Sequence, residues 1–389
     1  MDRGLIGGPF GSDLVSTDYS EAGVPVIRGS NLRSGSIDGE FAFVTPDKYK
    51  ADLIKNTAIP RDLIFTQRGT LGQVSIVPDE PYDKYVVSQS QMRLRVDESR
   101  FDPRYIYYAC TTAAFRKSIL DHAITTGVPH TNLTILADLT IPAVSLSEQS
   151  AISRVLGALD DKISVNRRTG ELVRQLLDAR WTQVQRSATS TVELDEIAQL
   201  NPRTMRTNGA TAPFVDMKSL PQGALLIDSW GEREPRSGAR FINGDTLLAR
   251  ITPCFENGKL ALVDFLDSGQ TGTGSTEFIV MRPKPGVPAV VPFLIAQSSD
   301  FRDHAAKTMT GTSGRQRVQA SGLADYVLSW PDKAELDQFT AFAEPVTSLL
   351  GRLRSENQTL ARTRDELLPL LMDGRITVKQ AEDSAGEVL

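Results

Sequence analysis

The sequence predicts an α+β chain in which two similar globular domains are separated by two long antiparallel helices that form a coiled coil. Three observations support this. Segments of the first half recur about 185 residues later, two long stretches repeat apolar residues at alternating spacings of three and four, and short apolar runs bounded by turn residues fill the rest. The predicted boundaries are 1–145 for the first domain, 146–190 for a central helix, 191–331 for the second domain, 332–375 for a C-terminal helix and 376–389 for a tail.

The internal repeat is the primary signal. Residues 59–66 (IPRDLIFT) correspond to 242–249 (INGDTLLA), and Thr126-Gly127 corresponds to Thr310-Gly311. The repeat is far longer than the 20–50 residues of solenoid proteins. A whole domain followed by a helix is therefore duplicated.

Within each domain the pattern predicts short strands and one helical region. Strands are expected at 24–28, 63–66, 74–77 and 92–96 in the first domain, and at 247–251, 260–263 and 278–281 in the second. Helices are expected at 103–121 and 292–309. Each domain is then a mixed α+β unit.

The long helices carry a coiled-coil seam. Because neither helix can bury its apolar stripe alone, we expect the two helices to pack against each other. About forty residues at 1.5 Å each span roughly 60 Å, enough to place two domains at separate positions on a duplex whose turn repeats every ~34 Å. Pro345 lies inside the second seam and is expected to kink or restart that helix.

Two polar residues, Asn166 and Asn357, occupy seam positions with apolar neighbours. One interpretation is imperfection tolerated near a partly exposed seam. The other is that both set the register of the coiled coil, as buried seam asparagines do elsewhere. Register matters here because the helix pair would fix the distance between the domains.

Composition excludes several classes of protein. With 389 residues, 40% hydrophobic residues and a net charge of −5, the chain is neither disordered nor collagenous, and it does not coat nucleic acid through bulk positive charge. Cys110 and Cys254 are far apart in sequence, which supports neither a disulfide framework nor a zinc site and favours the cytoplasm. No signal peptide and no 18-residue apolar stretch are visible, so no membrane is expected.

The sequence shows no recognisable catalytic motif. Gly258-Lys259 is followed by Leu260 and lacks the earlier glycine of a P-loop, and no GxSxG elbow occurs. The three histidines do not lie beside a second metal-ligand candidate, and Asn201-Pro202 continues into Arg203 rather than a methyltransferase motif. No catalytic or metal-binding residue is predicted, and the chain is not expected to be an enzyme.

Polar loops recur at matching places in both domains. Arg and Gln side chains read guanine and adenine edges, and nearby glycines let backbone approach a ligand closely. Hydroxyls and amides bind phosphates as well as bases. Taken alone, each loop is more often an ordinary solvated turn, but the recurrence of the same polar loops in both domains favours binding. The candidate DNA-binding residues are Arg28, Asn31, Gln67, Arg68, Thr70, Gln89, Gln91, His130, Thr131 and Asn132 in the first domain, and Arg250, Thr252, Asn257, Lys259, Ser275, Thr276, Arg315, Gln316 and Arg317 in the second.

The order and duplication of several segments carry a family resemblance. These are 8–12, 24–29 and 68–72 in the first domain, 250–259, 274–278 and 311–317 in the second, and 159–166, 356–357, 364–368 and 372–376 in the helices. Over nearly its whole length the chain resembles the specificity (S) subunit of type I restriction-modification systems.

The resemblance implies two target recognition domains, each reading one half of a bipartite double-stranded DNA target. It implies that the helices set the spacer length and dock two modification (methyltransferase) subunits, and that restriction (helicase-nuclease) subunits complete the complex. S-adenosylmethionine, ATP and Mg are then expected on those partners, and no cofactor on this chain.

One segment departs from the duplication. Residues 192–202 are typical of a domain start, whereas the first domain begins near Gly4 without an equivalent. Either the N-terminus is shortened or a strand is missing, and the tail at 373–389 is then placed to help close the fold.

Two other functions stay open. The runner-up is a non-catalytic, duplicated coiled-coil interaction protein that does not read DNA, and the third is a nuclease or methyltransferase acting alone. Neighbouring methyltransferase and helicase-nuclease genes would favour the specificity subunit. Methyl transfer by the purified chain would revive the third option.

Overall fold

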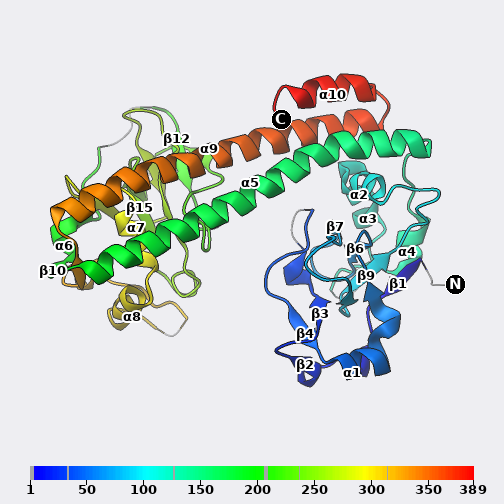
Figure 1. Cartoon of the computed structure of the whole chain (residues 1–389), viewed down its shortest axis with the longest axis horizontal. Helices are drawn as coiled ribbons and strands as arrows, with labels where there is room; N and C mark the ends of the chain where they lie inside the picture. Colours follow the sequence, from blue (N-terminus) through cyan, green and yellow to red (C-terminus); the bar gives the residue numbers. More distant parts are fainter. Residues whose placement is uncertain (1–3, 33–34, 126–127, 206–208, 236, 313) are drawn as a thin grey trace. The chain divides into compact units, whose positions relative to one another are not determined.

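The chain divides into two compact units, each of which contains sheets, short helices and part of both long helices (Figure 1). The computed structural model describes residues 4–32, 35–125, 128–205, 209–235, 237–312 and 314–389. Unit 1 comprises Met1–Ile163 and Thr359–Leu389, and unit 2 comprises Ser164–Gln358. Thr126 and Gly127, predicted to match Thr310 and Gly311, lie outside the described residues.

Unit 1 contains two sheets. Their strands are β1 (Leu5–Gly7), β2 (Tyr19–Ser20), β3 (Val24–Ile27), β4 (Ala42–Val44), β5 (Thr57–Ala58), β6 (Leu63–Thr66), β7 (Val74–Ile76), β8 (Tyr85–Val87) and β9 (Gln91–Leu94). One sheet has the order β1-β9-β6-β7 and the other β2-β4-β3-β8-β5. Strands β3 and β8 are parallel, and the other pairs are antiparallel.

Unit 2 repeats this arrangement. Its strands are β10 (Ser190–Glu193), β11 (Ala198–Leu200), β12 (Ala212–Val215), β13 (Gly231–Arg233), β14 (Ala239–Phe241), β15 (Thr246–Ala249), β16 (Leu260–Leu262), β17 (Gly272–Gly274), β18 (Phe278–Pro283) and β19 (Val327–Trp330). The sheet β11-β18-β15-β16 matches β1-β9-β6-β7 strand for strand. The sheet β13-β12-β17-β14 matches β4-β3-β8-β5, including the one parallel pair. The duplication predicted from sequence is therefore confirmed by topology.

The strand pair β10-β19 is the main difference between the units. Strand β1 occupies the sheet position of β11, but no described strand of unit 1 corresponds to β10. The segment 192–202 thus contains the end of β10, the turn of helix α6 (Leu194–Ile197) and strand β11. Among its described residues, unit 1 repeats only the last of these three elements.

The short helices break where a hydroxyl side chain can cap a new helix. Unit 1 has α1 (Pro46–Lys48), α2 (Pro103–Thr111), α3 (Ala113–Asp121) and α4 (Leu133–Asp138), and unit 2 has α7 (Val291–Gln297) and α8 (Ser299–Lys307). The single helices expected at 103–121 and 292–309 are each split in two. The side chain of Thr112 accepts the Phe115 N–H (3.2 Å), and Ser298 accepts that of Phe301 (3.3 Å), so each starts a new helix as its N-cap.

Helices α5 (Leu146–Ser187) and α9 (Lys333–Met372) contribute to the cores of both units. In unit 2 they run antiparallel, because Trp181 packs on Phe339 with ring centroids 4.9 Å apart while Ser187 bonds Glu335 at 2.7 Å. In unit 1, Leu156, Leu159 and Leu360 share one buried cluster. The predicted seam is therefore present in each unit.

Pro345 was predicted to kink or restart the helix, and the restart does not occur, because α9 is continuous across it. The proline ring is exposed, and the Thr347 hydroxyl bonds the carbonyl oxygens of Ala343 and Glu344, both at 3.0 Å. The bond that proline removes is a different one, from its own missing N–H to the carbonyl oxygen of Ala341.

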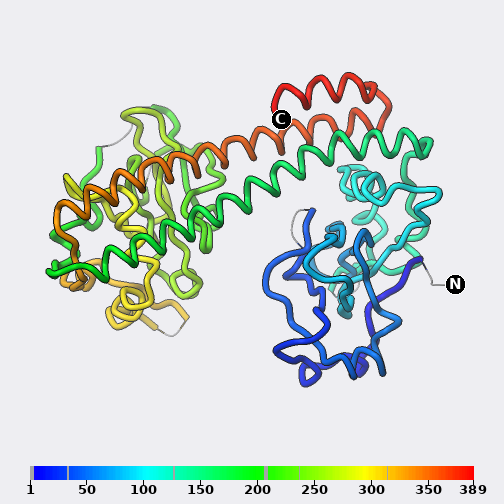
Figure 2. The backbone as a smooth tube through the Cα atoms, in the orientation of Figure 1, coloured from blue at the N-terminus to red at the C-terminus, as the bar shows by residue number. Residues whose placement is uncertain are grey.

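The C-terminal tail forms part of unit 1. Helix α10 (Val378–Gly386) lies alongside the C-terminal part of α9 (Figure 2), and Ala381 and Ala385 are buried in the unit 1 core. Within the described ranges, no helix is both long and apolar enough to cross a membrane.

A buried carboxylate anchors the strands at the same place in both units. Asp62 and Asp245 are 2% and 1% exposed and accept two hydrogen bonds from Arg95 and Arg282 respectively, at 2.7–2.8 Å. Asp62 also accepts the Ile59 N–H and Asp245 that of Ile242, both at 2.8 Å. The first pair joins the start of β6 to the end of β9, and the second joins the start of β15 to the end of β18.

We predict that Asp62→Ala destabilises unit 1 by about 3–5 kcal/mol, because it leaves an arginine without its buried partner. Hydrogen exchange should accelerate in β6 and β9 while β15 and β18 keep their protection. Asp245→Ala should produce the reverse pattern. Asp83→Ala, at a side chain that is 85% exposed, serves as the control, and unchanged exchange in Asp62→Ala would contradict the anchoring role.

Candidate nucleic-acid interface

Three polar loops meet at one edge of unit 1. Gln67 N–H donates to the carbonyl oxygen of Ser90 (2.8 Å), and Thr131 N–H donates to that of Gln67 (3.0 Å). Arg68 and His130 face each other in a single antiparallel bridge. We call residues 67–72, 88–90 and 128–132 the unit 1 loop cluster.

Unit 2 builds the same cluster with the same backbone hydrogen bonds. Arg250 N–H donates to the carbonyl oxygen of Glu277 (2.9 Å), and Val318 N–H donates to that of Arg250 (2.8 Å). Ile251 and Arg317 form the bridge that corresponds to Arg68 and His130. The unit 2 loop cluster comprises residues 250–258, 275–277, 310–312 and 314–317.

The side chains at corresponding positions differ, although the backbone is shared. The strand registers and loop hydrogen bonds pair Gln67 with Arg250, Arg68 with Ile251, Gln89 with Thr276, Ser90 with Glu277 and His130 with Arg317. The two units therefore have the same backbone arrangement but present different hydrogen-bond donors and acceptors.

In unit 1, the predicted residues divide by exposure. Arg68, Thr70 and Gln89 are exposed, and Gln67 and His130 are half-buried. Gln89 donates to the carbonyl oxygens of Gly11 and Leu14, both at 2.8 Å, and His130 Nδ1 lies 3.0 Å from the carbonyl oxygen of Val128. These side chains are accessible to a ligand.

The other predicted residues of unit 1 hold the scaffold. Asn31 is buried and bonds the backbone of Arg28, Asp38 and Glu40, and the Arg28 side chain also reaches the Glu40 carbonyl oxygen (3.5 Å). Gln91 and Thr131 are buried, and Gln91 bonds Ser88. Asn132 caps helix α4 by accepting the Ile135 N–H (2.9 Å). Asn31 and Asn132 thus bond the backbone around them, whereas the Gln91 Nε2 and Thr131 Oγ1 atoms are shielded and have no partner among the described residues.

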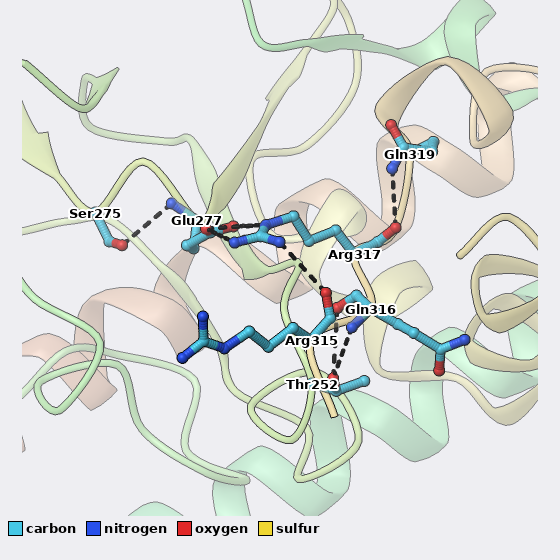
Figure 3. A network of polar contacts seen from close by, with 7 residues as sticks. All are labelled: Thr252, Ser275, Glu277, Arg315, Gln316, Arg317 and Gln319. Atoms are coloured by element: carbon cyan, nitrogen blue, oxygen red, sulfur yellow. Dashed lines mark hydrogen bonds and ion pairs between the residues drawn. The ribbon is translucent and has the colours of Figure 1, made fainter. Parts of the chain in front are cut away.

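In unit 2, an ion pair organises the cluster (Figure 3). The Glu277 carboxylate accepts hydrogen bonds from Nε and Nη2 of Arg317 at 2.7–3.0 Å, and Ser275 Oγ accepts the Glu277 N–H (3.1 Å). The hydrogen bonds from Arg317 lower the pKa of Glu277, and those to Glu277 raise the pKa of Arg317. The charge of Arg317 is thus compensated within the domain.

The remaining predicted residues of unit 2 differ in their exposure and in the hydrogen bonds that they already make. The buried Thr252 hydroxyl accepts the Gln316 N–H at 3.1 Å, and Lys259 Nζ donates to the Met217 carbonyl oxygen at 2.6 Å. Asn257, Thr276 and Arg315 are exposed, and Figure 3 shows no hydrogen bond from the Arg315 guanidinium to the other labelled residues. Arg315 is therefore the most accessible cation of the loop that follows helix α8.

Glu277 was not among the predicted binding residues, because its negative charge would repel the phosphates of DNA. Its proximity to Ser275, within a segment already noted for its duplication, was the available signal. The two seam asparagines come together in unit 2, where both line a cavity of about 330 Å³. The Nδ2 atom of Asn166 and the Oδ1 atom of Asn357 are shielded there and have no partner, so their role in register stays a prediction.

The described residues contain no group of three or more His, Cys, Asp or Glu side chains arranged to hold a metal ion. Cys110 is buried and burial raises the pKa of its thiol. Its reactivity as a nucleophile is correspondingly low.

The known proteins that are similar to this chain in sequence are all of one kind. Residues 16–174 match the family of the type I restriction modification DNA specificity domain. The EcoEI and EcoAI type I restriction enzyme specificity subunits of Escherichia coli are 29% and 27% identical over 201 and 202 residues, which is 50% of this chain and 34% of each relative. The matched region thus spans about a third of the length of these relatives.

The fold has a known counterpart as well. The S subunit of a type I restriction-modification system from M. genitalium has a TM-score of 0.56 at 15% identity, covering 94% of this chain and 92% of that one. The predicted resemblance to type I specificity subunits is confirmed, in sequence over residues 16–174 and in fold over nearly the whole chain.

Proposed function

We propose that this chain is the DNA specificity subunit of a type I restriction-modification complex, in which each unit reads one half of a bipartite double-stranded DNA target. The observation that carries the proposal is the pair of loop clusters, which share backbone hydrogen bonds but differ in side chains. A common backbone presents both clusters to DNA in the same way. Different side chains then select different bases.

The chemistry of the exposed side chains suits base reading. Arginine binds the O6 and N7 atoms of guanine, and glutamine binds the N6 and N7 atoms of adenine, both in the major groove. Arg68 and Arg315 are exposed on their loop clusters, and Gln89 is exposed beside Arg68. The backbone N–H of Thr131, which bonds Gln67, and the Asn132 cap of helix α4 hold these loops in place.

The main test is selection of bound duplexes from a randomised pool by the full chain, assembled with its methyltransferase partner. We expect two short conserved blocks separated by a fixed gap. Arg68→Ala and Arg315→Ala should each relax one block only, at a cost of about 1–3 kcal/mol for each lost base contact.

Arg352→Ala, at an exposed arginine of helix α9, is the control and should leave both blocks intact. An equal loss of affinity for all sequences in Arg68→Ala and Arg315→Ala would mark these residues as phosphate contacts. Failure of the wild-type complex to select any sequence would favour the alternative of an interaction protein that does not read DNA.

An exposed apolar stripe supports the docking of partner subunits. Val165, Leu172 and Leu176 of helix α5 are 60%, 57% and 56% exposed, and their spacing of seven and four residues puts them on one helix face. Contiguous exposed apolar surface of this kind marks an interface. We assign the stripe to a methyltransferase subunit, with two such subunits and restriction subunits in the complete cytoplasmic complex.

Catalysis then belongs to the partners, where S-adenosylmethionine, ATP and Mg would bind, and this chain contributes specificity. Helix α5 contributes residues to both units without interruption, and so does α9. We therefore assign to the helix pair the additional role of setting the spacer between the half-sites.

The docking assignment predicts that Leu172→Ser with Leu176→Ser reduces co-purification of methyltransferase subunits at least about tenfold, as expected when a buried apolar anchor is lost from an interface. The same substitution at Leu120, which is 56% exposed on α3, is the control. Unchanged co-purification would refute the assignment. Thermal unfolding of each variant separates this effect from misfolding.

A further inference from the structure

Unit 2 contains a cavity of about 440 Å³ whose described lining includes three arginines and no carboxylate. Arg203, Arg240 and Arg250 line it together with Thr276. We propose that this cavity binds a phosphodiester group of the DNA backbone, which gives unit 2 an anchoring contact that unit 1 lacks. This inference rests on the proposed function. It adds to that function a site beside the unit 2 loop cluster and names the ligand of the site.

The arginines are available to an anion. Arg203 is exposed and forms no ion pair with any residue of the described ranges. Arg240 donates one hydrogen bond, from Nη1 to the carbonyl oxygen of Thr204 at 3.3 Å, which leaves its charge uncompensated. The Nε atom of Arg250 is shielded from solvent and has no partner.

The Glu277 carboxylate, which interacts with one of the three arginines, is already engaged. Glu277 lies close enough to Arg250 for their charges to interact, but its oxygens accept the hydrogen bonds of Arg317. Three like charges around one cavity repel each other, and an anion between them removes that repulsion. Guanidinium groups also match the geometry of phosphate oxygens.

Comparison with unit 1 shows that the fold does not require these charges. The registers of β1 and β11 pair Arg203 with Gly8, and those of β5 and β14 pair Arg240 with Thr57. Arg250 corresponds to Gln67. Unit 1 thus forms the same fold with no charged residue at any of the three positions. The three arginines of unit 2 are therefore not needed to form the fold.

The position of the cavity favours a phosphate over a base. Arg250 and Thr276 belong both to the cavity lining and to the unit 2 loop cluster, so an anion bound there lies next to the side chains assigned to base reading. Phosphate contacts fix the register of a protein on the duplex while neighbouring side chains read the bases. A cavity lined by cations beside such a cluster fits this division of roles.

The salt dependence of DNA binding tests the proposal. Removing one phosphate contact makes the negative slope of log K against log salt less steep by about 0.9. The affinity lost between 50 and 200 mM salt should therefore be about 3.5-fold smaller in the double variant Arg203→Gln, Arg240→Gln than in the wild type. The selected sequence should not change. The measurement uses the full chain assembled with its methyltransferase partner, on the duplex that it selects.

A neutral methylphosphonate placed at each backbone position of the unit 2 half-site locates the contact. One position should weaken the wild type and leave the double variant unaffected. Arg352→Gln removes one exposed charge from helix α9 of the same unit and is the matched control, which should retain the wild-type slope.

Two results would overturn the proposal: a wild-type slope in the double variant, or a changed base preference in the unit 2 half-site. These outcomes are separate from failure of the proposed function, in which the wild-type complex would select no sequence. Equal thermal unfolding of the wild type and the double variant shows that the fold is retained.

Discussion

A buried carboxylate that accepts two hydrogen bonds from an arginine is the interaction on which both units depend. Asp62 with Arg95, and Asp245 with Arg282, hold the central strand against its neighbour and at the same time bond the turn that precedes it. The register of β6 with β9, and of β15 with β18, follows from this arrangement. The loops that leave these strands therefore start from the same geometry in both units, and their side chains are free to differ.

Electrostatics then distinguishes two otherwise similar units. Unit 2 pairs Arg317 with Glu277 but gives neither Arg203 nor Arg250 an ion pair within the described residues, whereas the corresponding positions of unit 1 are uncharged. A net charge of −5 for the whole chain conceals this local difference. Weak overall attraction to DNA suits a chain whose binding depends on a few placed cations and on partner subunits.

Patterns with a strong local cause could be predicted from sequence. The strand at 63–66 and the seam of the long helices follow from apolar periodicity, and β6 has the predicted bounds. The breaks at Thr112 and Ser298 could not be foreseen, because a hydroxyl caps a new helix only when the chain turns there. The burial of Asn31 and Gln91, and the meeting of Arg203 with Arg240, depend on pairing between distant strands that no local pattern encodes.

One scaffold thus carries two interchangeable sets of side chains. The most direct test is to replace residues 67–72, 88–90 and 124–130 with 250–258, 275–277 and 310–317, so that Arg317 takes the place of His130, and to determine the selected DNA. We predict that the two blocks of the target become the same sequence at an unchanged distance. A target whose first block remains that of the wild type would contradict it.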